Sequence, residues 1–107
     1  MIDWSRIVGF QWDAGNARKN LDKHGVQQAE AEEAFLYEPL IVAQDLRHSE
    51  QDLRHSEDED RFHALGATHA GRRLHITFAI RAGGTLIRVV SARDMSSKER
   101  AFYAERQ

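Results

Sequence analysis

Three runs of alternating apolar and polar residues in the second half of the chain constrain the fold more than any other feature. They read RFHALGA at 61–67, RLHITFAIR at 73–81 and TLIRVVSA at 85–92. Such alternation is typical of half-buried β-strands, and the connections HAGR (69–72) and AGG (82–84) suit hairpin turns. Strands joined by hairpins run antiparallel, so this half of the chain predicts an antiparallel sheet.

The rest of the chain predicts short strands and helices with recognisable ends. The expected strands lie at 8–12 and 40–43, and the expected helices lie at 14–23, at 27–37 and from 97 onward. Asp13 is the expected N-cap of the first helix, and Gly25 suits the left-handed residue that follows it. Pro39 ends the second helix, and Ser96 with Glu99 forms a capping box for the last.

This order of elements predicts an α+β fold, an antiparallel β-sheet with two N-terminal helices and one C-terminal helix. The length of 107 residues favours a single domain over 1–107. The absence of cysteine excludes disulfides and zinc sites that use thiolates. No apolar run approaches the length of a membrane span, and the N-terminus is too polar for a signal peptide, so we expect no membrane partner.

Strand parity sorts the side chains of this sheet onto two faces. One face is apolar and should pack against the helices; it comprises Leu74, Ile76, Phe78, Ile80, Ile87 and Val89. The opposite face gathers Arg61, His63, His75 and Arg88. Histidine transfers protons near neutral pH and arginine binds phosphate oxygens, so this face could cleave RNA through its own 2′-hydroxyl without a metal. The alternative is a polar, solvated sheet face without catalysis.

Two further positions are candidates with a structural alternative. Ser91 shares parity with Ile87 and Val89, so we expect it at the end of a buried row, where it could bind backbone or, with Arg93, a phosphate. His24 precedes a helix-ending glycine, where a cationic imidazole is stabilised by the helix dipole. A structural role for His24 is therefore the alternative to catalysis.

The heptad QDLRHSE occurs twice in succession, at 44–50 and at 51–57. Its histidines, His48 and His55, would lie about 10 Å apart along a helix and on opposite faces of a strand, so they cannot share one metal ion. One leucine per heptad gives no coiled-coil seam. We interpret the repeat as a tandem duplication in a loop, with the second copy beside Arg61 and the first looped out.

Together these motifs resemble the BrnT family, the toxin halves of bacterial type II toxin–antitoxin systems. The resemblance extends from about residue 7 to residue 103 and is carried by GFQWDAGNARKNLDKHGV, EEAFLYEPL, HSEDEDRFHALGATHAGRRLHITFAIR and LIRVVSARDMSSKER. It implies a compact ribonuclease with a RelE-like toxin fold that acts on RNA in the bacterial cytoplasm with no metal or cofactor. The family carries the HSE segment once, so one heptad copy is an insertion.

The resemblance also implies partners and site residues. The partner is a BrnA-type antitoxin with a ribbon-helix-helix part, so the toxin would contact DNA only through the antitoxin. The matched motifs carry over Arg61, Arg88, Ser91 and Arg93, followed by His24, whereas His63 and His75 rest on strand parity. Two functions stay open. One is an active endoribonuclease that inhibits translation and growth, and the other is a disabled module that binds the antitoxin and tunes operon repression.

Overall fold

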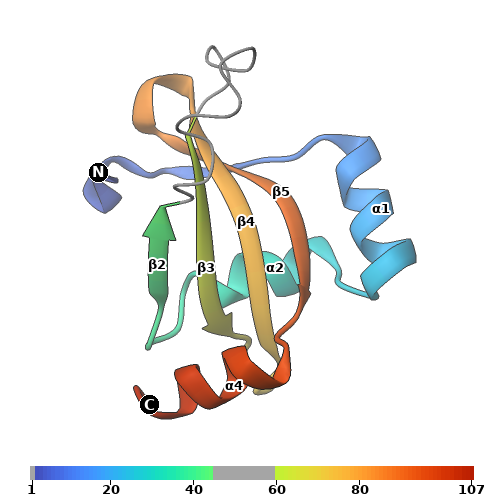
Figure 1. Cartoon of the computed structure of the whole chain (residues 1–107). Helices are drawn as coiled ribbons and strands as arrows, with labels where there is room; N and C mark the ends of the chain where they lie inside the picture. The colour runs from blue at the N-terminus through green and yellow to red at the C-terminus, as the bar shows by residue number, and fades with distance from the viewer. Residues whose placement is uncertain (1, 45–59) are drawn as a thin grey trace, which may run out of the picture.

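The computed structural model describes residues 2–44 and 60–107, and in these residues it contains a five-stranded sheet with helices around it (Figure 1). The elements, in chain order, are η1 (Trp4–Arg6), β1 (Gly9–Gln11), α1 (Ala14–His24), α2 (Gln28–Ala34), β2 (Ile41–Gln44), β3 (Arg61–Ala67), β4 (Arg73–Arg81), η3 (Ala82–Gly84), β5 (Leu86–Asp94) and α4 (Ser97–Ala104). The α+β class predicted from the sequence is confirmed. The question of which heptad copy lies beside Arg61 falls outside the described residues.

The sheet is mixed rather than fully antiparallel. Its order is β1-β5-β4-β3-β2, and the pairs from β2 to β5 are antiparallel, as the hairpin signals predict. The prediction is wrong at one edge, because β1 pairs with β5 in parallel, with Gly9 opposite Leu86 and Gln11 opposite Arg88. No hairpin joins these two strands, and the long path between them lets the chain return in the same direction.

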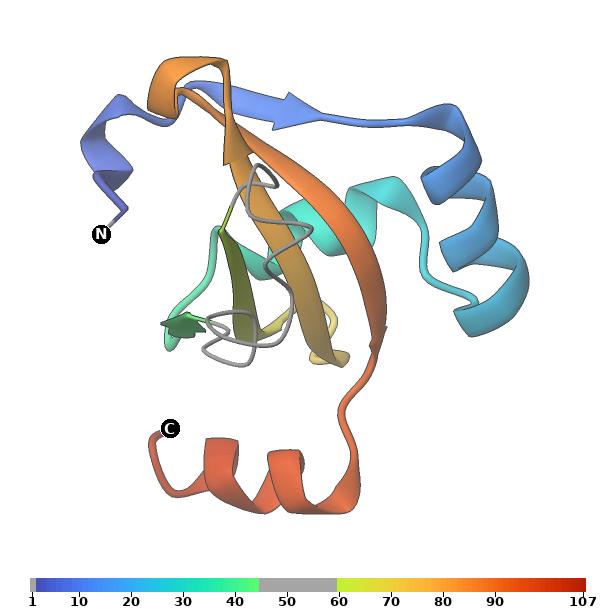
Figure 2. The same cartoon turned by 45° about the horizontal axis from the view of Figure 1, so that its top comes forward.

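The apolar face of the sheet forms the core beneath α2. Leu74, Ile76, Phe78, Ile87 and Val89 are buried as predicted, whereas Ile80 is only partly buried and packs against this core. The two views show α2 running across one side of the sheet, while α1 lies beside the β5 edge (Figures 1 and 2). Burial of this apolar surface is the main favourable contribution to folding.

A β-bulge in β5 changes which side chains face the core. Thr77 pairs with Ser91, but Phe78 pairs with Val89, so Val90 is one extra residue in β5. A bulge of this kind inverts the alternation beyond it. The prediction that Ser91 ends the buried row is therefore wrong: Ala92 is buried instead, and Ser91 shares the opposite face with Thr77.

The helix ends agree with the capping signals in all but one place. The Asp13 side chain accepts the Gly15 amide at the start of α1, and Gly25 follows α1 with φ 67°. The Ser96–Glu99 capping box starts α4. The second helix ends earlier than the predicted range 27–37, because the Phe35 and Leu36 amides bind carbonyls three residues back. Such 3₁₀-type bonds tighten and end a helix.

Within residues 2–44 and 60–107, no helix combines the length and the apolar character that crossing a membrane requires.

Candidate functional site

The candidate site is a groove on the sheet face opposite α2. Cross-strand neighbours on this face form rows, one of which joins His63, Thr77 and Ser91. The adjoining row joins Leu65, His75 and Arg93. The groove has a volume of about 470 Å³ and is lined by Ile41, Ala43, His63, Leu65, His75, Arg93, Glu99 and Phe102. Helix α4, which crosses the end of the sheet where β3 and β5 end (Figure 1), supplies Glu99 and Phe102.

Two histidines in the groove are in direct contact. Nδ1 of His63 lies 3.0 Å from Nε2 of His75, and the Thr77 hydroxyl oxygen lies 3.2 Å from the same Nδ1. A hydrogen bond between two ring nitrogens needs one donor and one acceptor. The pair therefore has a direction, and a change of tautomer in one ring forces a change in the other.

His75 is kept neutral by its surroundings. Its side chain is 15% exposed, and burial together with the positive charge of Arg93 and the neighbouring His63 lowers its pKa from 6.5 to about 4, against the opposite effect of Glu99. At neutral pH this imidazole therefore carries no charge. A pKa so far below 7 makes it a poor proton donor under those conditions, because little imidazolium is present.

Glu99 faces the other side of His75 as a carboxylate. Burial raises its pKa, but hydrogen bonds from Arg93 (2.9 and 3.0 Å) and from the Ser96 amide (2.9 Å) outweigh it and lower the pKa to about 2. Its Oε2 lies 3.4 Å from Nδ1 of His75. This contact is long for a hydrogen bond, yet Nδ1 is buried and has no closer partner in the described residues. The order Glu99, His75, His63 and Thr77 is a continuous polar chain across the groove.

The lowered pKa of His75 makes stability depend on pH. The unfolded chain binds a proton at His75 below pH 6.5, whereas the folded protein resists protonation down to about pH 4. The free energy of unfolding is therefore expected to fall by about 2 kcal/mol through this group between pH 7 and pH 5. Urea unfolding at pH 7, 6 and 5 measures this loss.

A His75→Asn variant isolates this contribution. The variant should lose clearly less stability than the unmodified protein over the same pH range, because asparagine does not titrate. Equal slopes in the two proteins would contradict the neutral, buried His75. Below pH 4.5 both proteins should lose further stability as Glu99, whose pKa is lowered by its partners, is protonated preferentially in the unfolded chain.

The two predicted arginines lie on the same face as the histidines, in the next row. Arg61 and Arg88 both pair with Ala79, so the three residues form one row. On β4 this row lies two positions beyond Thr77, which pairs with His63. This spacing corresponds to about 7 Å along a strand. Ala79 lies between the two arginines in this row and is fully buried.

Arg88 is oriented by residues next to β1. Its guanidinium donates to Gln11 Oε1 at 3.4 Å and to Asp13 Oδ2 at 3.3 Å. The Gly15 and Asn16 amides lower the pKa of Asp13, with a smaller effect from Arg88. The parallel strand β1 thus places one acceptor beside Arg88, and the N-cap of α1 places a second.

The remaining predicted residues have different positions. Arg93 reaches the groove, but both its terminal nitrogens bind Glu99. His24 is not among the residues that line the groove. Its carbonyl accepts a hydrogen bond from Arg72, whose guanidinium also binds Asp94 and Glu30. The printed contact of His24 involves its backbone, so the choice between a structural and a catalytic role of its imidazole stays a prediction.

Glu99 and Phe102 line the groove, and Thr77 contacts His63, but the sequence pattern did not point to any of the three. Glu99 carried a signal, the capping box that starts α4, but this signal has a complete structural explanation of its own. Thr77 shares strand parity with His75, but it neither titrates nor carries charge, so the pattern gives no signal for it. No pattern pointed to Phe102, because its position depends on how α4 crosses the sheet.

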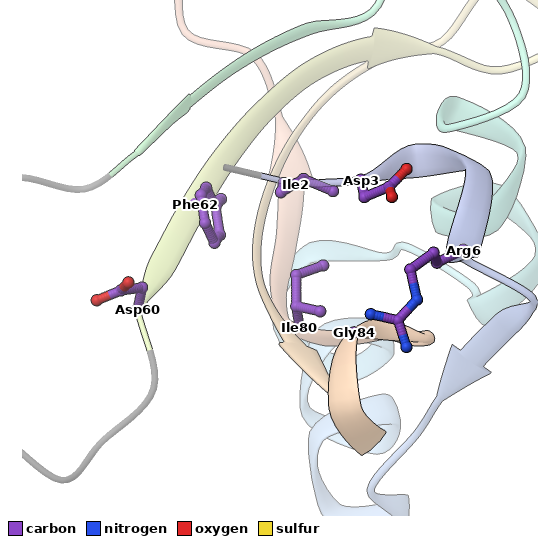
Figure 3. Close-up of a pocket in the computed structure, with 7 residues that line it drawn as sticks. All are labelled: Ile2, Asp3, Arg6, Asp60, Phe62, Ile80 and Gly84. Carbon is purple, nitrogen blue, oxygen red and sulfur yellow. The ribbon is translucent and has the colours of Figure 1, made fainter.

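A second pocket lies on the opposite side of the sheet and is less suited to chemistry. It has a volume of about 340 Å³ and is lined by Ile2, Asp3, Arg6, Asp60, Phe62, Ile80 and Gly84 (Figure 3). The described residues that line it include no histidine, and the Asp3 carboxylate is already bound by the Ser5 amide and hydroxyl. In the part of the chain that the structure describes, no group of three or more histidine or acidic side chains is arranged to hold a metal ion.

Comparison with known proteins connects this geometry to a family. A family model described as the ribonuclease toxin BrnT of type II toxin–antitoxin systems matches residues 12–99. The fold is similar to the 1.1 Å crystal structure of the Brucella abortus ribonuclease toxin BrnT, with a TM-score of 0.59, 20% identity, and coverage of 84% of this chain and 99% of that chain. At this identity the likeness concerns the fold alone. No curated protein sequence matches the chain.

Proposed function

This chain belongs to the BrnT family of ribonuclease toxins of type II toxin–antitoxin systems, and we propose that it is itself a metal-independent endoribonuclease whose active site is the groove over β3, β4 and β5. The observation that carries the proposal is the contact of His63 with His75, one row from Arg61 and Arg88 on the same sheet face. Proton transfer and phosphate binding, the two requirements of RNA cleavage, are thus available side by side.

The proposed reaction is a transesterification within the RNA. His63 accepts the proton of a 2′-hydroxyl, and the resulting oxygen attacks the adjacent phosphorus. The bond to the 5′-oxygen breaks, and this oxygen leaves with a proton from water. The products are a 2′,3′-cyclic phosphate and a 5′-hydroxyl end. Neutral His75 does not take part in this exchange directly, because its low pKa suits it to orient His63 instead.

Arg61 and Arg88 are proposed to stabilise the negative charge on the phosphate. A guanidinium presents a planar set of donors that matches two phosphate oxygens. The contacts from Gln11 and Asp13 hold the Arg88 group in one orientation before RNA arrives. Donors positioned in advance stabilise a transition state better than donors that must reorganise.

We further propose the cellular setting that family membership suggests. RNA cleavage would inhibit translation and growth in the bacterial cytoplasm until a cognate BrnA-type antitoxin with a ribbon-helix-helix part neutralises the toxin. DNA would be contacted only through that antitoxin. The mixed α+β sheet with a polar face also fits the RelE-like relationship, which we include in the proposal.

Expression without an antitoxin tests the function. We expect growth arrest and RNA degradation on induction in a bacterial host, and we expect Arg61→Ala or Arg88→Ala to lower the rate of RNA cleavage by about 10²-fold and to relieve the arrest. Arg18→Ala is the matched control, since Arg18 is an exposed helix residue whose ion pair among the described residues is with Asp22. It should leave the arrest unchanged.

The same experiment separates the two functions left open by the sequence. Unaffected growth and intact RNA, together with capture of a BrnA-type antitoxin, would show a disabled binding module and would contradict the endoribonuclease. If the Arg61→Ala, Arg88→Ala and Arg18→Ala variants were equally toxic, the ribonuclease activity would still be supported. The proposed role of Arg61 and Arg88, the arginine row, would be contradicted.

A further inference from the structure

We propose that Glu99 is a positioning residue that acts through His75 to hold the hydrogen of His63 on Nδ1, so that Nε2 of His63 is the nitrogen that accepts a proton. The part of this inference that concerns RNA rests on the proposed function, whereas the part that concerns the tautomers does not. It assigns to α4 a role in the chemistry of the sheet face, and the geometry supports it in two steps.

The first step joins Glu99 to His75. A carboxylate only accepts hydrogen bonds, and Oε2 of Glu99 is 3.4 Å from Nδ1 of His75. This nitrogen is buried and has no hydrogen-bond partner in the described residues, so the carboxylate is the acceptor that it faces. A neutral imidazole has one N–H group, and here that group belongs on Nδ1, directed at the negative charge.

The second step joins His75 to His63. With its hydrogen on Nδ1, His75 carries a lone pair on Nε2, which lies 3.0 Å from Nδ1 of His63. His63 must therefore donate from Nδ1. The Thr77 oxygen, 3.2 Å from the same nitrogen, is a second acceptor for this hydrogen. In neutral His63 the lone pair then lies on Nε2, in the form that a general base needs.

The direction of the chain depends on the charge of Glu99. If both imidazoles reversed their tautomers, His75 would donate from Nε2, and His63 would carry its hydrogen on Nε2, where it could not accept a proton. In residues 2–44 and 60–107 the other titratable groups that face His75 are Arg93 and His63, and neither provides an acceptor for Nδ1 of His75. Arg93 supports the arrangement by binding both oxygens of Glu99.

Glu99 also has a structural role, which the test must separate from positioning. Its side chain binds the Ser96 amide in the capping box of α4. Glutamine serves at this position of a capping box as well as glutamate does. Glu99→Gln therefore keeps the cap and removes the charge, whereas Ser96→Ala removes the hydroxyl acceptor of the cap and leaves the carboxylate in place.

Nitrogen-15 NMR of the histidine side chains in the full-length protein at pH 7.5 tests the inference directly. We expect His63 in the Nδ1–H form in the unmodified protein and in Ser96→Ala. In Glu99→Gln we expect the Nδ1–H population of His63 to fall at least twofold in favour of Nε2–H. An Nε2–H form in the unmodified protein, or an unchanged tautomer in Glu99→Gln, would overturn the proposal.

RNA cleavage provides the second measurement. Glu99→Gln is expected to lower kcat by about 10- to 10²-fold with little change in KM, because binding of RNA does not require one tautomer of His63. Ser96→Ala should retain its kcat at a temperature well below its unfolding transition. Loss of kcat in Ser96→Ala equal to that in Glu99→Gln would assign the effect to the cap and overturn the positioning role.

The two measurements can reject the proposed function and the role of Glu99 independently of each other. If the unmodified protein cleaves no RNA but the tautomer of His63 still depends on Glu99, the proposed function fails and the tautomeric control stands. If RNA is cleaved and Glu99→Gln leaves both tautomer and kcat unchanged, the function stands and the role of Glu99 fails.

Discussion

Replacement of His63 with alanine is expected to lower the rate of RNA cleavage by about 10²–10⁴-fold, the usual contribution of a general base. His63 is only partly buried, and it contacts His75 and Thr77 at the edge of the groove. The variant should therefore fold, and the loss should appear in kcat rather than in stability. Single-turnover cleavage of a short RNA by the purified protein measures the effect, with thermal unfolding as a check on the fold.

Two controls make the His63 experiment specific. His69→Ala changes an exposed histidine whose ring packs against Tyr37 outside the groove, and it should cleave RNA at the unmodified rate. A substrate with deoxyribose at the scissile position lacks the attacking hydroxyl and should resist the unmodified protein. Cleavage of RNA by His63→Ala at the normal rate, or cleavage of the deoxyribose substrate, would refute the proposed mechanism.

Replacement of Gly66 with alanine is expected to lower the free energy of unfolding by about 3 kcal/mol, the upper range for overpacking a core. Gly66 lies on β3 beneath the end of α2, where an added Cβ would come within 2.5 Å of the Ala34 carbonyl oxygen and 3.2 Å of Leu40 Cδ1. The first of these neighbours is backbone, so relief requires α2 to move away from the sheet. Equilibrium unfolding in urea measures the change.

Gly9 provides a matched control for the Gly66 variant. It is also a strand glycine, but a Cβ there would meet Leu86 Cδ2 at 3.6 Å, an ordinary contact. Gly9→Ala should change the free energy of unfolding by less than about 1 kcal/mol, since only backbone freedom and minor packing differ. Similar losses in the two variants would show that the approach of α2 to β3 is not the cause.

The antiparallel part of the sheet was predictable from the sequence because it is determined by neighbouring residues along the chain. Alternation identifies the strands, and short turns with glycine set the direction of their neighbours, as for β3, β4 and β5. The direction of β1 was not predictable in this way, since alternation is the same in parallel and antiparallel strands. The bulge at Val90 was not predicted for a related reason. An extra residue in one strand is visible only against its partner, so parity placed Ser91 on the wrong face.

The same distinction explains which site residues were found. The prediction that His63 and His75 share a face rests on strand parity. It is correct because the pairing of β3 with β4 is regular over both positions. Their contact needs the actual register, which sets His63 opposite Thr77 and His75 opposite Leu65. Glu99 could not be found from pattern, because the crossing of α4 over the sheet end is a tertiary property. Its capping signal also had a sufficient local explanation.

The parallel pairing of β1 with β5 has a consequence for the order of events during protein synthesis. Arg88 and its acceptor Gln11 are 77 positions apart, so β1 leaves the ribosome long before its partner strand exists. Contacts between such distant segments form slowly, because the long intervening chain must be closed into a loop. Arg88 cannot acquire its orientation until β5 has emerged and paired on both edges. Under the proposed function, a nascent chain would therefore lack its complete arginine row until β5 has been translated and has paired with β1.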